Sequence, residues 1–166
     1  MIKLLGMVLL VAGFVGLSIE KVKEEKASID YLNELKRFIT YLLREIEYSN
    51  IPIPDICMEY KGRSEGKMYI FIERVSERFA QNEGKSFDCI WKEEIDKLKK
   101  EEKQLLDSLG KSFGFCNKKM QLSAIGQQLQ EIEKMILHKE KKFQDNKKLI
   151  LYFGVMSGLL LSIILL

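Results

Sequence analysis

Apolar side chains recur at helical spacing through residues 20–148. Intervals of three and four residues place side chains on one face of an α-helix, so the pattern predicts amphipathic helices. The first stripe predicts a long helix that starts before residue 20 and ends near Asn50, and the last predicts a helix that continues into the C-terminal segment. The two stripes are Leu32, Leu35, Phe38, Ile39, Leu42 and Ile46, and Leu122, Ile125, Leu129, Ile132, Ile136 and Phe143.

Two prolines mark the end of the first long helix. A residue before proline avoids helical geometry, so Ile51 and Ile53 should lie outside it. Pro54 suits the first turn of a helix, and a short second helix is expected from Pro54 to about Tyr60.

Three further helices are expected before the last one. The first covers 67–80, with a strand over 68–72 as the alternative. The second covers 87–98, with Ser86 as its N-cap. The three cysteines of the chain are expected to be small buried residues of the domain. The third follows a weak break at 99–101 and ends at a turn bracketed by two glycines, and Asn117 can then cap the last helix. Those glycines are Gly110 and Gly114, and the cysteines are Cys57, Cys89 and Cys116.

Both ends of the chain are nearly free of charge over a length that suits a membrane span. Residues 149–166 rise about 27 Å as a helix, close to the roughly 30 Å hydrocarbon thickness of a bilayer. We predict transmembrane helices at 2–19 and 149–166 around a central domain at 20–148. A buried core helix is the alternative for the second span. A secretory signal peptide is the alternative for the first, although no small-residue cleavage site follows Gly16.

Charge is confined to the middle of the chain. All 24 acidic residues and 26 of the 27 basic residues lie between Glu20 and Lys148, and the net charge is +3. This balance is too small to indicate nucleic acid as a partner. Lysines flank both predicted spans on the side of the central domain, which by the positive-inside rule makes the domain cytoplasmic. The run Lys139–Lys148 could also contact anionic lipid.

The predicted fold is all-α: an antiparallel up-and-down bundle of about six helices, anchored by an N-terminal and a C-terminal transmembrane helix. The odd number and wide spacing of the cysteines fit neither a disulfide framework nor a metal motif. Small residues in the two spans, Ala12 with Gly16 and Gly154 with Gly158, would allow close packing of membrane helices, either within one chain or in a homo-oligomer.

No residue pattern supports catalysis. Two Gly-Lys-Ser triplets, at Gly84 and Gly110, lack the second glycine that a phosphate loop needs, so both should be helix-boundary loops. His138, the single histidine, should face solvent, with a pH sensor as the alternative. Glu93-Glu94 and Glu101-Glu102 lie among lysines and should be solvated. We therefore assign no catalytic, cofactor-binding or metal residue, and expect no cofactor and no enzymatic activity.

Five motifs follow one another along the chain. They are Leu35-Lys36-Arg37, Ile46-Glu47-Tyr48 with Ile51-Pro52-Ile53-Pro54, the lone Trp91, Leu105-Leu106-Asp107-Ser108-Leu109-Gly110 with Phe113-Gly114, and Tyr152-Phe153-Gly154-Val155. In this order, between the two uncharged ends, they resemble the stage III sporulation protein AB family of endospore-forming bacteria. The chain departs from the family's pattern at Phe115–Lys119, where an acidic cap is expected.

That resemblance implies a cytoplasmic six-helix domain similar to those of the inner-membrane platform protein of type II secretion and pilus systems. It implies a non-catalytic platform of the mother-cell-to-forespore channel complex needed for endospore formation, as a two-pass protein of the mother-cell membrane that faces the forespore. The implied partners are a secretion-type ATPase, the AA protein of the same operon, and the other channel subunits. The alternative is a general membrane-tethered helical scaffold of the envelope or division machinery, without an ATPase partner.

Overall fold

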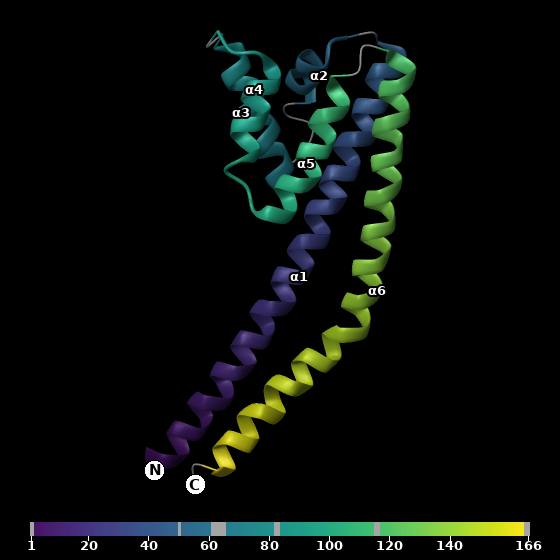
Figure 1. Cartoon of the computed structure of the whole chain (residues 1–166). Helices are drawn as coiled ribbons and strands as arrows, with labels where there is room; N and C mark the ends of the chain where they lie inside the picture. Colours follow the sequence, from purple (N-terminus) through teal and green to yellow (C-terminus); the bar gives the residue numbers. More distant parts are fainter. Residues whose placement is uncertain (1, 50, 61–65, 82–83, 115–116, 165–166) are drawn as a thin grey trace. The chain divides into compact units, whose positions relative to one another are not determined.

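The structure, a computed structural model, describes the chain except for residues 1, 50, 61–65, 82–83, 115–116 and 165–166. The described residues form six α-helices and no strand, which confirms the predicted all-α class and excludes a strand at 68–72 (Figure 1). The helices are α1 (Ile2–Tyr48), α2 (Ile53–Tyr60), α3 (Lys67–Ala80), α4 (Phe87–Ile95), α5 (Lys100–Phe113) and α6 (Lys118–Ile164).

The chain divides into two compact units, to which α1 and α6 both contribute. Unit 1 comprises residues 1–30 and 135–166, and unit 2 comprises residues 31–134. The predicted boundaries of the central domain, at residues 20 and 148, lie outside the limits of unit 2.

Unit 2 is a helical bundle built on the stripe of α1. Every member of that stripe is buried, and Leu35, Phe38 and Ile39 are fully so. Burial of such a side chain contributes about 1.5–3 kcal/mol relative to exposure, so the stripe is a main source of stability. Consecutive short helices pack on one another, α2 on α3, α3 on α4 and α4 on α5.

Two contacts show that α1 and α6 are antiparallel within unit 2. Lys118 Nζ donates to the Glu47 carbonyl at 2.9 Å, and Lys36 Nζ pairs with Glu133 Oε1 at 2.9 Å. The two helices therefore run in opposite directions, as predicted for an up-and-down bundle.

The caps predicted for α4 and α6 are confirmed. The Ser86 side chain accepts from the Cys89 amide, and Asn117 Oδ1 accepts from the Lys119 amide at 2.9 Å. Both bonds go to amides of the first helical turn, where the backbone offers few partners, and the Cys89 amide also donates to the Ser86 carbonyl at 3.1 Å. The predicted end of α4 at Leu98 is wrong, because the helix stops at Ile95 and turns before α5.

The start of α3 depends on a glycine that the sequence did not single out. Gly66 has φ 118°, and the Glu34 carboxylate lies where its Cβ would be. From there Glu34 Oε2 accepts from the Met68 amide at 2.9 Å, so a side chain of α1 caps α3. Only glycine combines that backbone conformation with room for the carboxylate.

The turn predicted at Gly110 is wrong. Gly110 lies within α5, and a Cβ there would be 2.7 Å from Trp91 Nε1. Trp91 Nε1 donates to the Leu106 carbonyl at 3.0 Å in the same helix. Gly110 therefore serves as the surface on which the indole ring packs, and α5 continues to Phe113.

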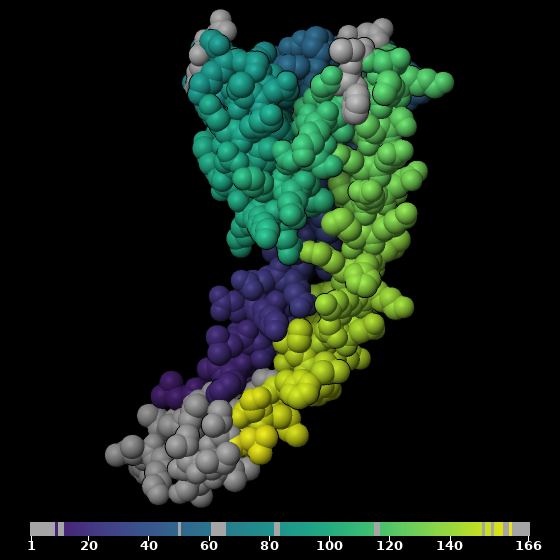
Figure 2. Space-filling model, in the orientation of Figure 1, coloured from purple at the N-terminus to yellow at the C-terminus, as the bar shows by residue number. Residues whose placement is uncertain are grey.

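Unit 1 consists of two antiparallel helical segments, the N-terminal part of α1 and the C-terminal part of α6 (Figures 1 and 2). Lys139 Nζ donates to Ser28 Oγ at 2.7 Å between them. Side chains that are at least partly buried recur every three or four residues, which is the spacing of a two-helix seam. They include Val15, Ser18, Val22, Glu25 and Ile29 on α1, and Ile136, Lys139, Phe143, Asn146 and Ile150 on α6.

Among the described residues, none of the helices combines the length and the apolar character that a membrane crossing requires. The structure therefore does not support the transmembrane helices predicted at 2–19 and 149–166.

Candidate docking groove at one end of the bundle

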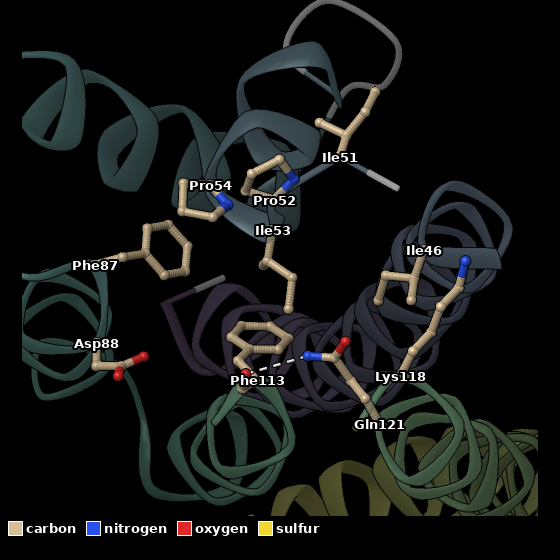
Figure 3. A pocket seen from close by; sticks show the side chains of 10 residues that line it. All are labelled: Ile46, Ile51, Pro52, Ile53, Pro54, Phe87, Asp88, Phe113, Lys118 and Gln121. Carbon is tan, nitrogen blue, oxygen red and sulfur yellow. Dashed lines mark hydrogen bonds between the residues drawn. The ribbon is translucent and has the colours of Figure 1, made fainter. Parts of the chain in front are cut away.

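A groove of about 410 Å³ lies in unit 2, at the end where α1 stops and α6 starts (Figure 3). Along α1 this end is about 25 Å from residue 31, where the chain leaves unit 1, at about 1.5 Å per residue. The groove is lined by Ile46, the segment 51–54, Phe87, Asp88, Phe113, Lys118 and Gln121.

One wall is the proline-rich segment 51–54, which was predicted to separate the first two helices but not to line a binding surface. Ile51 to Pro54 leave α1 and enter α2, where the Pro52 carbonyl accepts from the Asp55 and Ile56 amides. Figure 3 shows Pro54 beside Phe87, and the Ile53 side chain directed toward Phe113. Two prolines restrict the backbone, so this wall has little conformational freedom to lose when a ligand binds.

The opposite wall is aromatic and is backed by the core. Phe87 and Phe113 lie with their ring centroids 5.9 and 5.0 Å from that of Trp91, and the Phe71 ring meets the same indole at 4.9 Å. Edge-to-face and tilted pairs at these separations are favourable aromatic geometries. Because Trp91 is itself buried and hydrogen-bonded, the wall is preformed.

The polar groups at the groove are mostly acceptors. Gln121 Nε2 donates to the Phe113 carbonyl at 3.1 Å. A carbonyl only accepts, so the amide nitrogen must face it, and Oε1 remains as an acceptor on a side chain that lines the groove. Lys118 uses its ammonium group on the Glu47 carbonyl. Asp88, exposed in the first turn of α4, has no ion-pair or hydrogen-bond partner for its carboxylate among the described residues.

Two exposed apolar side chains belong to the same end of the bundle. Tyr48 is the last residue of α1 and is 76% exposed, and Met120 lies in the first turn of α6 and is 57% exposed. Large side chains left in solvent beside an apolar groove are typical of an interaction surface.

A charged cluster fixes α4 on α3 next to this surface. Arg78 of α3 donates to Glu93 Oε2 at 2.6 Å and to Glu94 Oε1 at 2.8 Å. Lys85 and Lys97 complete the cluster, at 2.7 Å from Glu93 and 2.5 Å from Glu94. The prediction that Glu94 is solvated is therefore wrong, because the side chain is 2% exposed and its charge is balanced by two cations.

Those bonds keep both carboxylates ionised. Hydrogen bonds from Lys85 and Arg78 lower the pKa of Glu93 from 4.5 to about 2. Burial raises the pKa of Glu94, but the hydrogen bonds from Lys97 and Arg78 outweigh burial and leave that pKa below its ordinary value. Neither group can therefore donate a proton at neutral pH, and the pair acts as a structural tie.

The other residues considered from sequence do not meet at one site. His138 is exposed on α6, as predicted. Gly84 has φ 70° in the loop before α4, as predicted for a helix boundary, whereas the second triplet is wrong as a loop because it lies inside α5. Within the described ranges, no group of His, Cys, Asp and Glu side chains is placed to hold a metal ion.

The cysteine prediction holds for one of the two cysteines that the structure describes. Cys57 is buried, and burial raises the pKa of its thiol, which keeps the thiol protonated. Cys89 is exposed, so the prediction of burial is wrong there. Cys116 lies outside the described residues.

A family model described as stage III sporulation protein AB matches residues 3–166 of the chain. No curated protein and no solved structure matches the chain significantly.

Proposed function

Because this chain belongs to the stage III sporulation protein AB family, which implies a role in sporulation, we propose that it is a membrane platform for the mother-cell-to-forespore channel. In this proposal unit 1 anchors the protein in the mother-cell membrane. Unit 2 lies in the cytoplasm and docks a secretion-type ATPase, the AA protein of the same operon. The platform is non-catalytic, and other channel subunits contact its anchors.

The observation that carries the proposal is the exposure of large apolar side chains on both helices of unit 1. Leu17 and Phe153 are each 64% exposed. A patch of this kind marks a surface that contacts lipid or protein. The same set includes Leu9, Ile19, Leu149, Tyr152, Val155, Met156 and Leu160.

Two features of the sequence support a membrane in particular. The segments 2–19 and 149–166 contain one charged residue, Lys3. The described residues hold no helix long and apolar enough to cross a membrane. We infer the crossing from the length of the two segments and their near absence of charge. Lys21, Lys23, Lys147 and Lys148 are exposed next to the uncharged segments and favour a cytoplasmic side for unit 2.

The groove supports a docking role over a catalytic one. Its polar groups are a carboxylate, a carboxamide and an ammonium group already bonded to a backbone carbonyl. Acid–base catalysis needs a group poised to exchange a proton at the operating pH, together with a nucleophile or a metal. The described residues at the groove do not supply that set.

Attachment and sidedness can be tested with one native cysteine. Cys89 is exposed and Cys57 is buried. Once Cys116 is replaced by serine, a membrane-impermeant maleimide should therefore label Cys89 alone. We expect the full chain to stay in the membrane fraction after carbonate extraction. Labelling should require opened cells, and Cys89→Ser should abolish it. Labelling of intact cells would contradict a cytoplasmic unit 2.

ATPase docking is tested by co-purification of the full chain, in detergent, with the AA-type ATPase. We expect the pair to elute together and the isolated ATPase to elute separately. If the anchored protein binds no ATPase, the general membrane-tethered scaffold is the better description.

We also propose that the two long helices couple unit 2 mechanically to the uncharged segments 2–19 and 149–166. Both α1 and α6 pass from one unit to the other, and Lys148 lies in α6 at the edge of the uncharged segment. Two glycines inserted after Lys148 should interrupt the helix there, because glycine is a poor helix former. We expect sporulation to fail with membrane attachment retained, and normal sporulation would argue for simple tethering.

A further inference from the structure

We propose that the groove at the end of unit 2 is an anchor site for a partner segment that carries a bulky apolar side chain next to a Lys or Arg. Under the proposed function, on which this assignment of the partner rests, the segment belongs to the ATPase.

The size and walls of the groove select the apolar part of the ligand. A volume of about 410 Å³ lies near the lower end of the range of small-ligand pockets and suits one large side chain with its neighbouring backbone. The proline-rich wall offers apolar contacts from Ile53 and Pro54, and the aromatic wall offers them from Phe87 and Phe113 (Figure 3). Anchors of this kind, and aromatic ones above all, dominate protein interfaces.

The rim selects the charge of the ligand. The Asp88 carboxylate has no partner among the described residues, and Gln121 keeps Oε1 as an acceptor. The ammonium group of Lys118 is engaged with the Glu47 carbonyl. The groove thus carries a negative charge at Asp88, beside Phe87, and keeps the positive charge of Lys118 near Ile46 (Figure 3). The end at Asp88 complements a cationic side chain and repels a carboxylate.

The walls keep their shape without a ligand. Phe87 and Phe113 rest on Trp91, and Trp91 rests on Gly110. Arg78 holds α4, which carries both Phe87 and Asp88, to α3 through Glu93 and Glu94. A preformed site loses little conformational entropy on binding, so a short segment can bind usefully.

The first experiment uses small probes of matched shape and opposite charge. Tryptamine and indole-3-propionate are titrated into the full chain in detergent, with isoleucine methyl groups followed by NMR. We expect tryptamine to shift the Ile53 and Ile46 signals and to bind about two to five times more tightly, the range for a partly exposed ion pair. Asp88→Asn should remove the preference and retain the shifts. An equal or opposite preference, or shifts confined to other methyl groups, would overturn the inference.

The second experiment uses the ATPase itself. Asp88→Arg should weaken its binding at least about tenfold, because a like charge then faces the cationic segment. Glu131→Arg makes the same charge change at an exposed site of unit 2 on α6 and should leave binding unchanged. Asp88→Asn should fall between wild type and Asp88→Arg, with circular dichroism confirming that each variant is folded.

The outcomes separate the two proposals. ATPase binding that is unaffected by Asp88→Arg rejects the groove and leaves the platform role intact. Absence of ATPase binding by the wild-type chain rejects the platform role, and the indole probes then decide the groove alone. If Asp88→Arg instead changes self-association in analytical ultracentrifugation, the groove is an interface between copies of this chain, and the inference is wrong.

Discussion

The two units treat apolar side chains in opposite ways, although the same two helices contribute to both. In unit 2 Leu35, Phe38 and Ile39 are completely buried, whereas in unit 1 Leu17 and Phe153 are 64% exposed. The hydrophobic effect therefore drives the packing of unit 2, because burial removes the apolar surface of these side chains from water. Unit 1 gains no such stabilisation from Leu17 and Phe153, because most of their surface stays exposed.

The polar residues differ in a parallel way. In unit 2 buried charge is balanced, with Glu94 held by Arg78 and Lys97. In unit 1 the seam itself contains polar groups, such as the Lys139 and Ser28 pair. Polar residues in a two-helix seam specify alignment at a cost in stability. Unit 2 thus balances its buried charge, whereas polar groups in the seam of unit 1 specify how its two helices pair.

The largest effect on stability is expected when a large side chain is removed from the core of unit 2. Trp91→Ala should destabilise the bundle by about 3–5 kcal/mol, the usual cost of deleting a large buried aromatic side chain. Urea unfolding of the full chain in detergent, followed by circular dichroism, measures the change. A loss below about 1 kcal/mol would show that the aromatic cluster is not central to the bundle.

Loss of the ion pairs between Arg78 and the two glutamates of α4 should have the next largest effect on stability. Arg78→Met should cost about 2–3 kcal/mol at neutral pH, because the buried Glu94 loses one of its two charge-assisted hydrogen bonds. The depressed pKa of Glu93, about 2, means that the tie is complete above pH 4.5 and is lost as pH falls toward 2. Unfolding curves of wild type and variant should therefore converge at low pH. A difference that is independent of pH would contradict the ionic origin.

Substitution by alanine at two glycines of unit 2 should change its stability in opposite directions. Gly66→Ala should cost about 1–3 kcal/mol, since alanine is strained at φ 118° and its Cβ would displace the Glu34 carboxylate that caps α3. Gly126→Ala is the matched control, because Gly126 lies within α6 with nothing near its Cβ position, and it should stabilise by about 0.5–1 kcal/mol. Calorimetric melting temperatures that move in the same direction would refute the distinction.

The smallest effect is expected in unit 1. Phe153→Ser should change the stability of unit 2 by less than about 0.5 kcal/mol, as for an exposed site, whereas Leu35→Ser should greatly weaken it. Amide hydrogen exchange of a peptide covering residues 32–46 reports on unit 2 in both variants. Equal loss of protection would show that the two units share one cooperative core.

Much of the fold was predictable because helical periodicity and capping are local. The stripe from Leu32 to Ile46 and the helical class followed from spacing, and the Ser86 and Asn117 caps followed from residue type. Gly110 was misread because a glycine that ends a helix and one that admits an indole ring look alike in sequence. What distinguishes them is Trp91, which lies in another helix.

The groove was less predictable, since its lining comes from five separate stretches of chain. The sequence marked Ile51-Pro52-Ile53-Pro54 as a break, and pairing of that segment with Phe87 and Phe113 depends on tertiary packing. The burial of Glu94 was missed for the same reason. Mixed charges at helical spacing are usually solvated, and Arg78, the partner that compensates for burial, lies sixteen residues away.

Trp91 is the one tryptophan of the chain, and it lies within unit 2. Its intrinsic fluorescence is therefore a built-in optical signal of that unit, with emission characteristic of a dry, hydrogen-bonded indole. Phe87 and Phe113 join the ring directly to the groove wall, so occupation of the groove should alter the emission without any attached dye. Rearrangements confined to unit 1 should leave it unchanged. The same indole that packs on Gly110 thus lets the two units be followed independently in one unlabelled protein.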